Sequence, residues 1–100
     1  MAYGFEWDAE KAAANIAKHA VGFSEACTVF EDPRAVALAD TRHSGAEARF
    51  VLLGRSFHHR LLVVCYTDRP PRTRIISARR ASRRERRQYE THGYEDPTAR

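Results

Sequence analysis

The chain contains few cysteines and no long hydrophobic segment. Its 100 residues include only two cysteines, Cys27 and Cys65, and neither lies in a CxxC spacing or next to a histidine at metal-ligand spacing. This argues against a disulfide framework and a zinc site, and favours two small core side chains in a reducing compartment. No apolar run approaches the roughly 18–20 residues of a membrane span, and no secretory signal is visible. The sequence therefore predicts a cytoplasmic protein without a membrane partner.

Lysine is also scarce, because arginine supplies 15 of the 17 basic residues. A GC-rich genome alone can produce such a ratio, so the distribution along the chain is more informative. Residues 1–68 carry seven basic and nine acidic side chains, whereas residues 69–100 carry ten arginines and four acids. Within Arg69–Arg87, the only acid is Glu85. This concentration is typical of a surface that contacts a polyanion or an acidic protein.

The N-terminal part is predicted to be helical, within one domain over residues 1–100 that ends in a frayed tail at 93–100. Asp8 is suited to cap the alanine-rich run that follows it, and Gly22 can end this helix. Ser24 is expected to cap a second short helix, which the Asp32-Pro33 turn stops. The apolar stripe of the first helix is predicted to contain Ala12, Ala13, Ile16, Ala17 and Ala20. Its polar face is predicted to contain Lys11, Asn15 and Lys18.

Strand patterns occupy the middle of the chain, at residues 35–39, 48–53, 60–67 and 74–78. The connections DTRHSG, GRSFHH and DRPPRT are short enough for hairpins, so an antiparallel meander is expected. The run RLLVVCYT is almost continuously apolar, as in a central strand covered on both faces.

The motif SRRE at Ser82–Glu85 matches a capping box and predicts a third helix to about His92, ended by Gly93. Beyond Ala81 and Tyr89 this helix offers little apolar surface, so we expect it to be weakly held. The pattern as a whole predicts an α+β fold, with two N-terminal helices packed on a four-stranded antiparallel sheet plus a C-terminal helix.

Three segments carry a resemblance to a known protein family. They are FEWDAEKAAANIAKHAVGFSEACTVFEDP at residues 5–33, EARFVLLG at 47–54, and YTDRPPRTRIISARRASRRERRQYE at 66–90. On these segments the chain resembles the BrnT family of ribonuclease toxins, from bacterial type II toxin-antitoxin modules. The family usually places glycine directly after the Lys-His pair, whereas Lys18-His19 is followed by Ala20 here. We therefore expect the first helix to continue slightly beyond His19.

The resemblance implies a RelE-like fold and an endoribonuclease that needs no metal. Such a toxin would cleave cellular RNA and thereby inhibit translation. It also implies neutralisation by a BrnA-type antitoxin, typically a ribbon-helix-helix DNA-binding protein. The toxin would then contact DNA only indirectly, through the complex with its antitoxin.

A ribonuclease of this kind has to deprotonate a ribose 2′-hydroxyl, stabilise charge on the phosphate and help the 5′ oxygen to leave. Glu47 and Arg49 lie two apart in a predicted strand and should point to the same face of the sheet. Glu47 could then act as base or orienter while Arg49 holds the phosphate. The alternative is a solvent-exposed ion pair on an amphipathic strand. The resemblance at EARF favours the catalytic role.

Arg79 precedes the N-terminus of the third helix, where backbone donors and the helix dipole favour an anion, so we expect it to bind the scissile phosphate. Arg69 is a second candidate clamp, or else only a turn residue. Tyr66 could stack on a base or donate a proton, or pack in the core. His19 beside Lys18 is a candidate acid or base, since an unperturbed histidine has a pKa of about 6.5. The alternative for His19 is a helix C-terminal cap.

The arginine-rich region allows three interpretations: an RNA-backbone track, a docking surface for an acidic antitoxin, or a solvated helix face. The residues expected to contact RNA are Arg69, Arg74, Arg80, Arg83 and Arg84. Two other functions fit the same residues, a non-catalytic basic module that binds nucleic acid or an acidic partner, and a decayed toxin that acts only in the repressor complex. No metal or other cofactor is expected, because His58-His59 has no cysteine or acid at ligand spacing.

Overall fold

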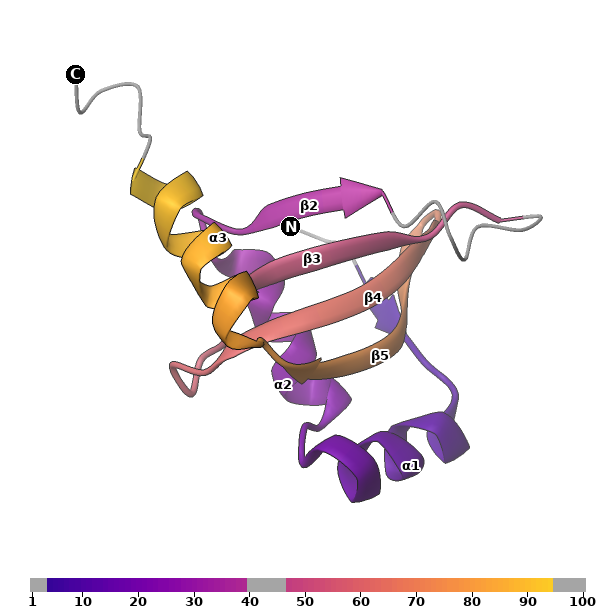
Figure 1. The fold of residues 1–100 in the computed structure, drawn as a ribbon. Helices are drawn as coiled ribbons and strands as arrows, with labels where there is room; N and C mark the ends of the chain where they lie inside the picture. The colour runs from indigo at the N-terminus through magenta and orange to yellow at the C-terminus, as the bar shows by residue number, and fades with distance from the viewer. Residues whose placement is uncertain (1–3, 40–46, 95–100) are drawn as a thin grey trace.

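The computed structural model describes residues 4–39 and 47–94, so the predicted DTRHSG turn and the tail from residue 95 lie outside it. The elements in chain order are β1 (Gly4–Glu6), α1 (Ala9–His19), α2 (Phe23–Thr28), the 3₁₀ turn η1 (Val29–Glu31), β2 (Val36–Ala39), β3 (Phe50–Arg55), β4 (Leu61–Arg69), β5 (Arg72–Arg80) and α3 (Arg83–Tyr94). The described strands form one sheet of order β1-β5-β4-β3-β2. Helices α1 and α2 lie on one side of this sheet and α3 crosses its other side (Figure 1).

The predicted antiparallel meander is confirmed for β2, β3, β4 and β5, which pair in sequence order. The prediction of four antiparallel strands is nevertheless wrong, because β1 adds a fifth strand parallel to β5 and makes the sheet mixed. In this register Gly4 lies opposite Arg72 and Glu6 opposite Arg74. A strand of three residues is too short to show an alternating pattern, and its partner lies far along the chain. No local feature of the sequence therefore predicts β1.

Helix α1 begins as predicted and ends earlier than predicted. The Asp8 carboxylate accepts a hydrogen bond from the Lys11 N–H at 2.9 Å, as an N-cap does. The helix stops at His19, because Ala20 adopts the left-handed conformation with φ 58° and donates its N–H to the Ile16 carbonyl. Ala20 thus takes the backbone conformation that glycine usually provides at a helix end.

An Ala20→Gly substitution is expected to stabilise the protein by about 0.5–1 kcal/mol. A left-handed alanine costs about 1–2 kcal/mol, and part of the gain is offset by the greater freedom of glycine in the unfolded chain. Ala20 is exposed, so no packing is lost. Urea unfolding measures the change. The matched control is Ala14→Gly, at an exposed mid-helix position, which should lose about 1 kcal/mol.

The face that α1 buries differs from the predicted apolar stripe. Ile16 is 54% exposed, whereas Asn15, assigned to the polar face, is only 7% exposed. The Asn15 side-chain amide donates to the Val21 and Ala78 carbonyls at 2.9 and 2.7 Å, and its oxygen accepts from the Ala78 N–H at 3.2 Å. Strand β1 pairs with β5 only at its N-terminal end, around Arg72–Arg74. Asn15 therefore supplies hydrogen bonds to the backbone N–H and carbonyl of Ala78, at a part of β5 that β1 does not pair with.

Helix α2 begins two residues earlier than its predicted capping residue implies. Gly22, rather than Ser24, is its N-cap. The reason lies in the core, because Val21 and Phe23 on either side of Gly22 are 0% and 2% exposed. Burial of this pair sets where the helix starts, and Ser24 is left exposed in the first turn.

Strand β4 is covered on both faces, as predicted, since Leu61, Leu62, Val63 and Val64 are all buried. Leu62 and Val64 pack with Phe23, Val29 and other residues of the α1 and α2 side. Leu61 and Val63 pack with Leu53 and Tyr89 on the α3 side. The cysteines are free and half-buried, and burial raises the pKa of the Cys27 thiol to about 11.

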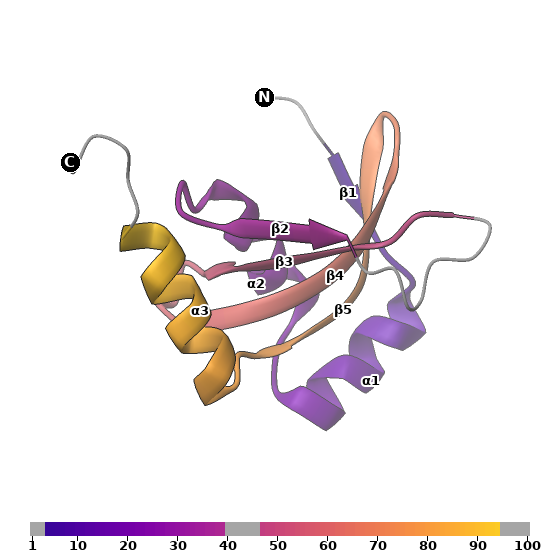
Figure 2. The ribbon, with the colours of Figure 1, turned by 45° about the horizontal axis from the view of Figure 1, so that its top comes forward.

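Helix α3 lies on the surface, as expected, but it is anchored more firmly than its composition indicates. Tyr89 is 6% exposed, and its hydroxyl donates to the Asp32 carboxylate at 2.7 Å. The Asp32 carboxylate also accepts the backbone N–H groups of Arg34 and Arg55. The helix continues through Gly93 to Tyr94. Figure 2 shows α3 beside the β3–β4 hairpin at one end of the sheet, with β1 and the β4–β5 hairpin at the other.

Candidate functional site

One face of the sheet is only partly covered. Side chains alternate between the two faces of a strand, so the residues in register with Leu61 and Val63 lie on the α3 side. Tyr89 covers this side at the α3 end, over Leu53, Leu61 and Val63. We call the remainder the open face. The register places on it Glu6, Cys65, Thr67, Arg69, Arg72, Arg74, Ser77 and Arg79.

Two acids and two arginines form a network at the β1 end of the open face. The Arg69 guanidinium donates to both Glu47 carboxylate oxygens, at 2.7 and 3.1 Å. Arg74 donates to Glu6 at 3.1 Å, and Arg69 lies 4.0 Å from the same Glu6 oxygen. Most of this network is solvent-accessible, with the Arg69 side chain 47% exposed. The network therefore holds its guanidinium groups in fixed positions without withdrawing them from solvent.

Glu47 is an ionised partner in this network. The hydrogen bonds from Arg69 lower the pKa of Glu47, and the charges of Arg49 and Arg74 act in the same direction. Contrary to prediction, Glu47 and Arg49 precede β3 and do not lie in it. The preceding backbone is fixed because the Thr67 hydroxyl donates to the Ala48 carbonyl at 2.7 Å. A carboxylate in this setting is a weak base and a strong orienter of Arg69.

Arg79 is also paired, at the other end of the open face. Its guanidinium donates to both Glu85 oxygens at 2.8 Å. The predicted capping box is confirmed, because Glu85 accepts the Ser82 N–H at 2.8 Å and the Ser82 hydroxyl accepts the Glu85 N–H at 3.2 Å. The Glu85 carboxylate thus accepts hydrogen bonds both from the Arg79 guanidinium and from the Ser82 backbone N–H at the start of α3. A phosphate at Arg79 would have to share or displace this carboxylate.

The Arg79–Glu85 pair is expected to make stability depend on acid pH. The hydrogen bonds from Arg79 are the largest cause that lowers the pKa of Glu85, to about 2 from its ordinary 4.5. A carboxyl whose folded-state pKa is lowered contributes stability above about pH 4.5, and this contribution is lost as the pH falls toward 2. Glu85→Gln keeps the capping geometry and should cost about 1 kcal/mol at neutral pH.

Urea unfolding of both proteins across pH 2 to 7 measures this dependence, and their difference should shrink in that acid window. Glu90→Gln, at an exposed glutamate of the same helix, is the control and should change little. A difference between wild type and Glu85→Gln that is constant with pH would contradict the assignment.

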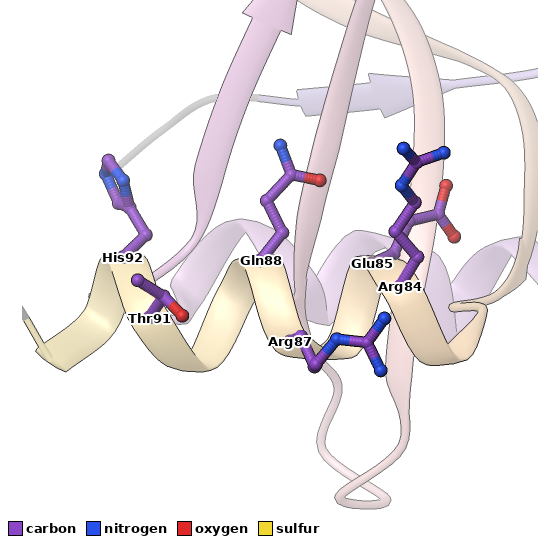
Figure 3. Close-up of a pocket in the computed structure, with 6 residues that line it drawn as sticks. All are labelled: Arg84, Glu85, Arg87, Gln88, Thr91 and His92. Carbon is purple, nitrogen blue, oxygen red and sulfur yellow. The ribbon is translucent and has the colours of Figure 1, made fainter.

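The arginines of α3 contrast with those of the open face. No ion pair is found for them in the described part of the chain, and all are exposed. We call this set the α3 arginine surface, and its residues are Arg83, Arg84, Arg86 and Arg87. Arg80, which is expected to contact RNA, lies opposite Leu62 in the β4–β5 register and so belongs to the α1 and α2 side of the sheet. Figure 3 shows Arg84, Gln88 and His92 projecting on the same side of the helix, along a shallow open depression that Arg87 and Thr91 also line.

Comparison with known proteins adds to this geometry. The model of the family described as "Ribonuclease toxin, BrnT, of type II toxin-antitoxin system" matches residues 7–85. The chain belongs to the BrnT family. The crystal structure of the Brucella abortus ribonuclease toxin BrnT is similar in fold, with a TM-score of 0.63 and 22% sequence identity. The structural alignment covers 82% of this chain and 100% of the Brucella abortus chain. No curated protein matches the chain.

The BrnT family match extends from α1 to the first turn of α3. It therefore includes Arg69, Arg74 and the Arg79–Glu85 pair, together with Glu47. Arg86 and Arg87 follow the matched region. The fold is the α+β fold of BrnT, with three helices and a five-stranded mixed sheet in the described residues.

Three of the predicted catalytic residues lie away from the open face of this BrnT family member. Tyr66 points to the α1 and α2 side, where its ring meets Phe30 edge-on at 4.9 Å and stacks on Phe50 at 5.6 Å. Burial raises the pKa of Tyr66, and the charge of Asp68 adds to this. Lys18 and His19 end α1, the helix that packs on β5 from that same side. The structure thus brings Glu47, Arg69 and Arg74 together and places Arg79 at the other end of the same face. Lys18, His19 and Tyr66 lie on the opposite side of the sheet.

Glu6 was not predicted from the sequence, although it is the second acid of the network. It pairs with Arg74 across 68 positions of the chain, so only the parallel β1–β5 register reveals it. Within residues 4–39 and 47–94, no group of three or more His, Cys, Asp or Glu side chains is arranged to hold a metal ion. No described helix is long and apolar enough to cross a membrane.

Proposed function

We propose that this BrnT family member is an endoribonuclease toxin that cleaves cellular RNA in the cytoplasm, without a metal ion, and so inhibits translation. The observation that carries the proposal is the clustering of guanidinium groups on one side of the molecule. The open face offers fixed arginines, and the adjoining α3 arginine surface offers exposed ones. RNA phosphates require both an attractive track and fixed donors at the scissile group.

The chemistry is assigned to the open face. Arg69, Arg74 and Arg49 would stabilise charge on a phosphate near Glu47. Arg69 donates to Glu47 and shares Glu6 with Arg74, and the charge of Arg49 helps to lower the pKa of Glu47. Glu47 either accepts the 2′-hydroxyl proton or orients Arg69, and its bidentate contact with Arg69 supports the second role. Arg79 contributes a further guanidinium if RNA displaces Glu85. Lys18, His19 and Tyr66 stay outside this assignment because they lie on the opposite side of the sheet.

The partner proposed for the inhibited state is a BrnA-type antitoxin with a ribbon-helix-helix fold. An acidic segment of such a protein would complement the α3 arginine surface, which also serves as the RNA track. One surface with two competing polyanionic ligands explains inhibition directly. DNA would be contacted only through the antitoxin.

A second candidate function is a non-catalytic basic module, or a decayed toxin that acts only in the repressor complex. The pairing of Arg69, Arg74 and Arg79 with carboxylates favours it, because paired arginines on the open face can serve structure alone. Under this alternative the α3 arginine surface still binds nucleic acid or an acidic partner.

Separate Glu47→Gln and Arg79→Gln variants distinguish the two functions. An enzyme should lose RNA cleavage in both variants, and Glu47→Gln should still bind RNA because it leaves every arginine in place. A binding module should show no cleavage in wild type, and its salt-sensitive binding should weaken when an exposed arginine of α3 is replaced, as in Arg84→Gln, and not in Glu47→Gln. Expression of the chain with and without the neighbouring antitoxin gene gives the cellular test. Absence of growth arrest and of RNA loss from the isolated chain would exclude the toxin.

A further inference from the structure

The β3–β4 hairpin presents an exposed aromatic side chain at its tip. Phe57 is 71% exposed, more than any other large hydrophobic residue in the described part of the chain. It lies between Ser56 and the pair His58-His59, in a segment without any acid from Gly54 to Arg60. A single exposed apolar residue is common on protein surfaces and needs no special explanation by itself. The way in which this one is supported is the informative observation.

The backbone at the tip is held by several independent contacts. The Phe57 N–H donates to the Thr28 hydroxyl at 2.9 Å, which joins the tip to α2. Ser56 is 5% exposed, and its hydroxyl donates to Glu25 at 2.7 Å. Arg60 donates to the same carboxylate through its Nε at 3.0 Å and to the Ala20 carbonyl at 3.1 Å. The turn is therefore fixed to the α2 side, and it presents Phe57 from a rigid base.

The hairpin that carries the tip also contacts helix α3. The Arg55 guanidinium donates to the His59 carbonyl at 3.3 Å and lies 5.6 Å from the centre of the Tyr89 ring. The Ala81 N–H, just before α3, donates to the Leu61 carbonyl at 2.9 Å. Both ribbon views place the hairpin and α3 at the same end of the sheet (Figures 1 and 2). The hairpin that carries Phe57 and the helix that carries the exposed arginines therefore lie at the same end of the sheet.

We propose that Phe57 is a base-stacking site, on which an unpaired nucleobase of single-stranded RNA packs while α3 holds neighbouring phosphates. This inference rests on the proposed RNA-binding function and adds a contact outside the open face. Sites for single-stranded nucleic acid combine a cationic track with aromatic rings, because every base has a π-face that can stack. The ring favours RNA over an acidic protein segment, because a nucleobase can pack on an apolar ring whereas an acidic side chain finds no partner there.

The test is binding of a short single-stranded RNA with 2′-O-methyl groups on every sugar, which prevents attack by the 2′-hydroxyl. Phe57→Ala should weaken binding by about 5- to 150-fold. Phe57→Leu should weaken it nearly as much, because it keeps an apolar side chain without a π-face. Phe57→Trp should bind at least as well as wild type. All three variants should fold, since the side chain is mostly solvent-exposed.

An RNA that carries an abasic site at each position provides the matched ligand control. Wild type and Phe57→Ala should bind it equally, and Phe57→Ala should leave the slope of affinity against salt concentration unchanged, because it removes no charge. Phe57→Trp adds a second tryptophan to Trp7, and the fluorescence in excess of the wild-type signal should be quenched by the 2′-O-methyl RNA and not by abasic RNA.

Several results would overturn the inference. Binding by Phe57→Ala within twofold of wild type would do so, with the proposed RNA-binding function left intact. Full binding by Phe57→Leu would point to an apolar contact without stacking, and loss of antitoxin neutralisation with unchanged RNA binding would assign the ring to a protein partner. If wild type binds no RNA at all, the proposed function fails and this inference fails with it.

Discussion

Replacement of Arg83, Arg84, Arg86 and Arg87 together by glutamine is expected to weaken binding of single-stranded RNA between about 100- and 1,000-fold at about 0.1 M salt. Each arginine that contacts a phosphate releases counterions, with a slope of about 0.7 in log affinity against log salt concentration. Loss of four contacts should therefore lower the slope by about 3. Binding measured over a series of salt concentrations, with the 2′-O-methyl RNA, gives both quantities.

The four substitutions should leave α3 folded. Glutamine has a helix propensity close to that of arginine, and the anchoring residues Glu85 and Tyr89 are unchanged. A charge control is Lys11→Gln, which removes an exposed cation of α1 on the other side of the sheet and should change the slope little. A quadruple variant with the wild-type slope would show that RNA does not follow the α3 arginine surface.

Replacement of Asn15 by leucine is expected to destabilise the protein by about 3–5 kcal/mol. The substitution leaves the Val21 carbonyl and both backbone groups of Ala78 without the partners that Asn15 supplies. Each buried group that loses its hydrogen bond costs about 1–3 kcal/mol, and the leucine cannot compensate because the site is built for an amide. Urea unfolding at neutral pH measures the loss.

Ile16→Ala is the control for the Asn15 prediction, since its side chain is the neighbouring apolar one and is largely exposed. It should change stability by less than about 0.5 kcal/mol. An Asn15→Leu variant as stable as wild type would mean that water satisfies the edge of β5 without the amide.

These two neighbours also explain how far the sequence predicts the fold. The spacing of the alanines and Ile16 predicts the position of α1 correctly. The helix contains so many alanines, however, that more than one of its faces could be the apolar one. The buried face is decided by Asn15, whose partner Ala78 lies 63 positions away. In contrast, the Asp8 cap and the Ser82–Glu85 capping box involve residues three apart and were predicted from the sequence.

The sequence predicts that the candidate site is rich in arginine, but it does not predict which arginines pair with which carboxylates. The excess of arginine after residue 68 is visible in the sequence. Which arginines are paired depends on register, because Glu47 and Arg69 are 22 positions apart and Glu6 and Arg74 are 68 apart. Tyr66 points away from the open face because side chains alternate along β4, which puts Tyr66 on the same side as the buried Leu62 and Val64. The structure thus divides one arginine cluster into fixed pairs on the open face and exposed cations on α3.

The central claim is that this chain cleaves RNA with its own side chains, and cleavage by the purified protein in the presence of EDTA tests it most directly. Attack by the 2′-hydroxyl requires products with a 2′,3′-cyclic phosphate and a 5′-hydroxyl, and 2′-O-methyl RNA should stay intact. Wild type should give these products, and Arg69→Gln with Arg74→Gln should reduce the rate by about 100-fold or more. Intact RNA with wild type, or cleavage that appears only after Mg²⁺ is added, would contradict the account.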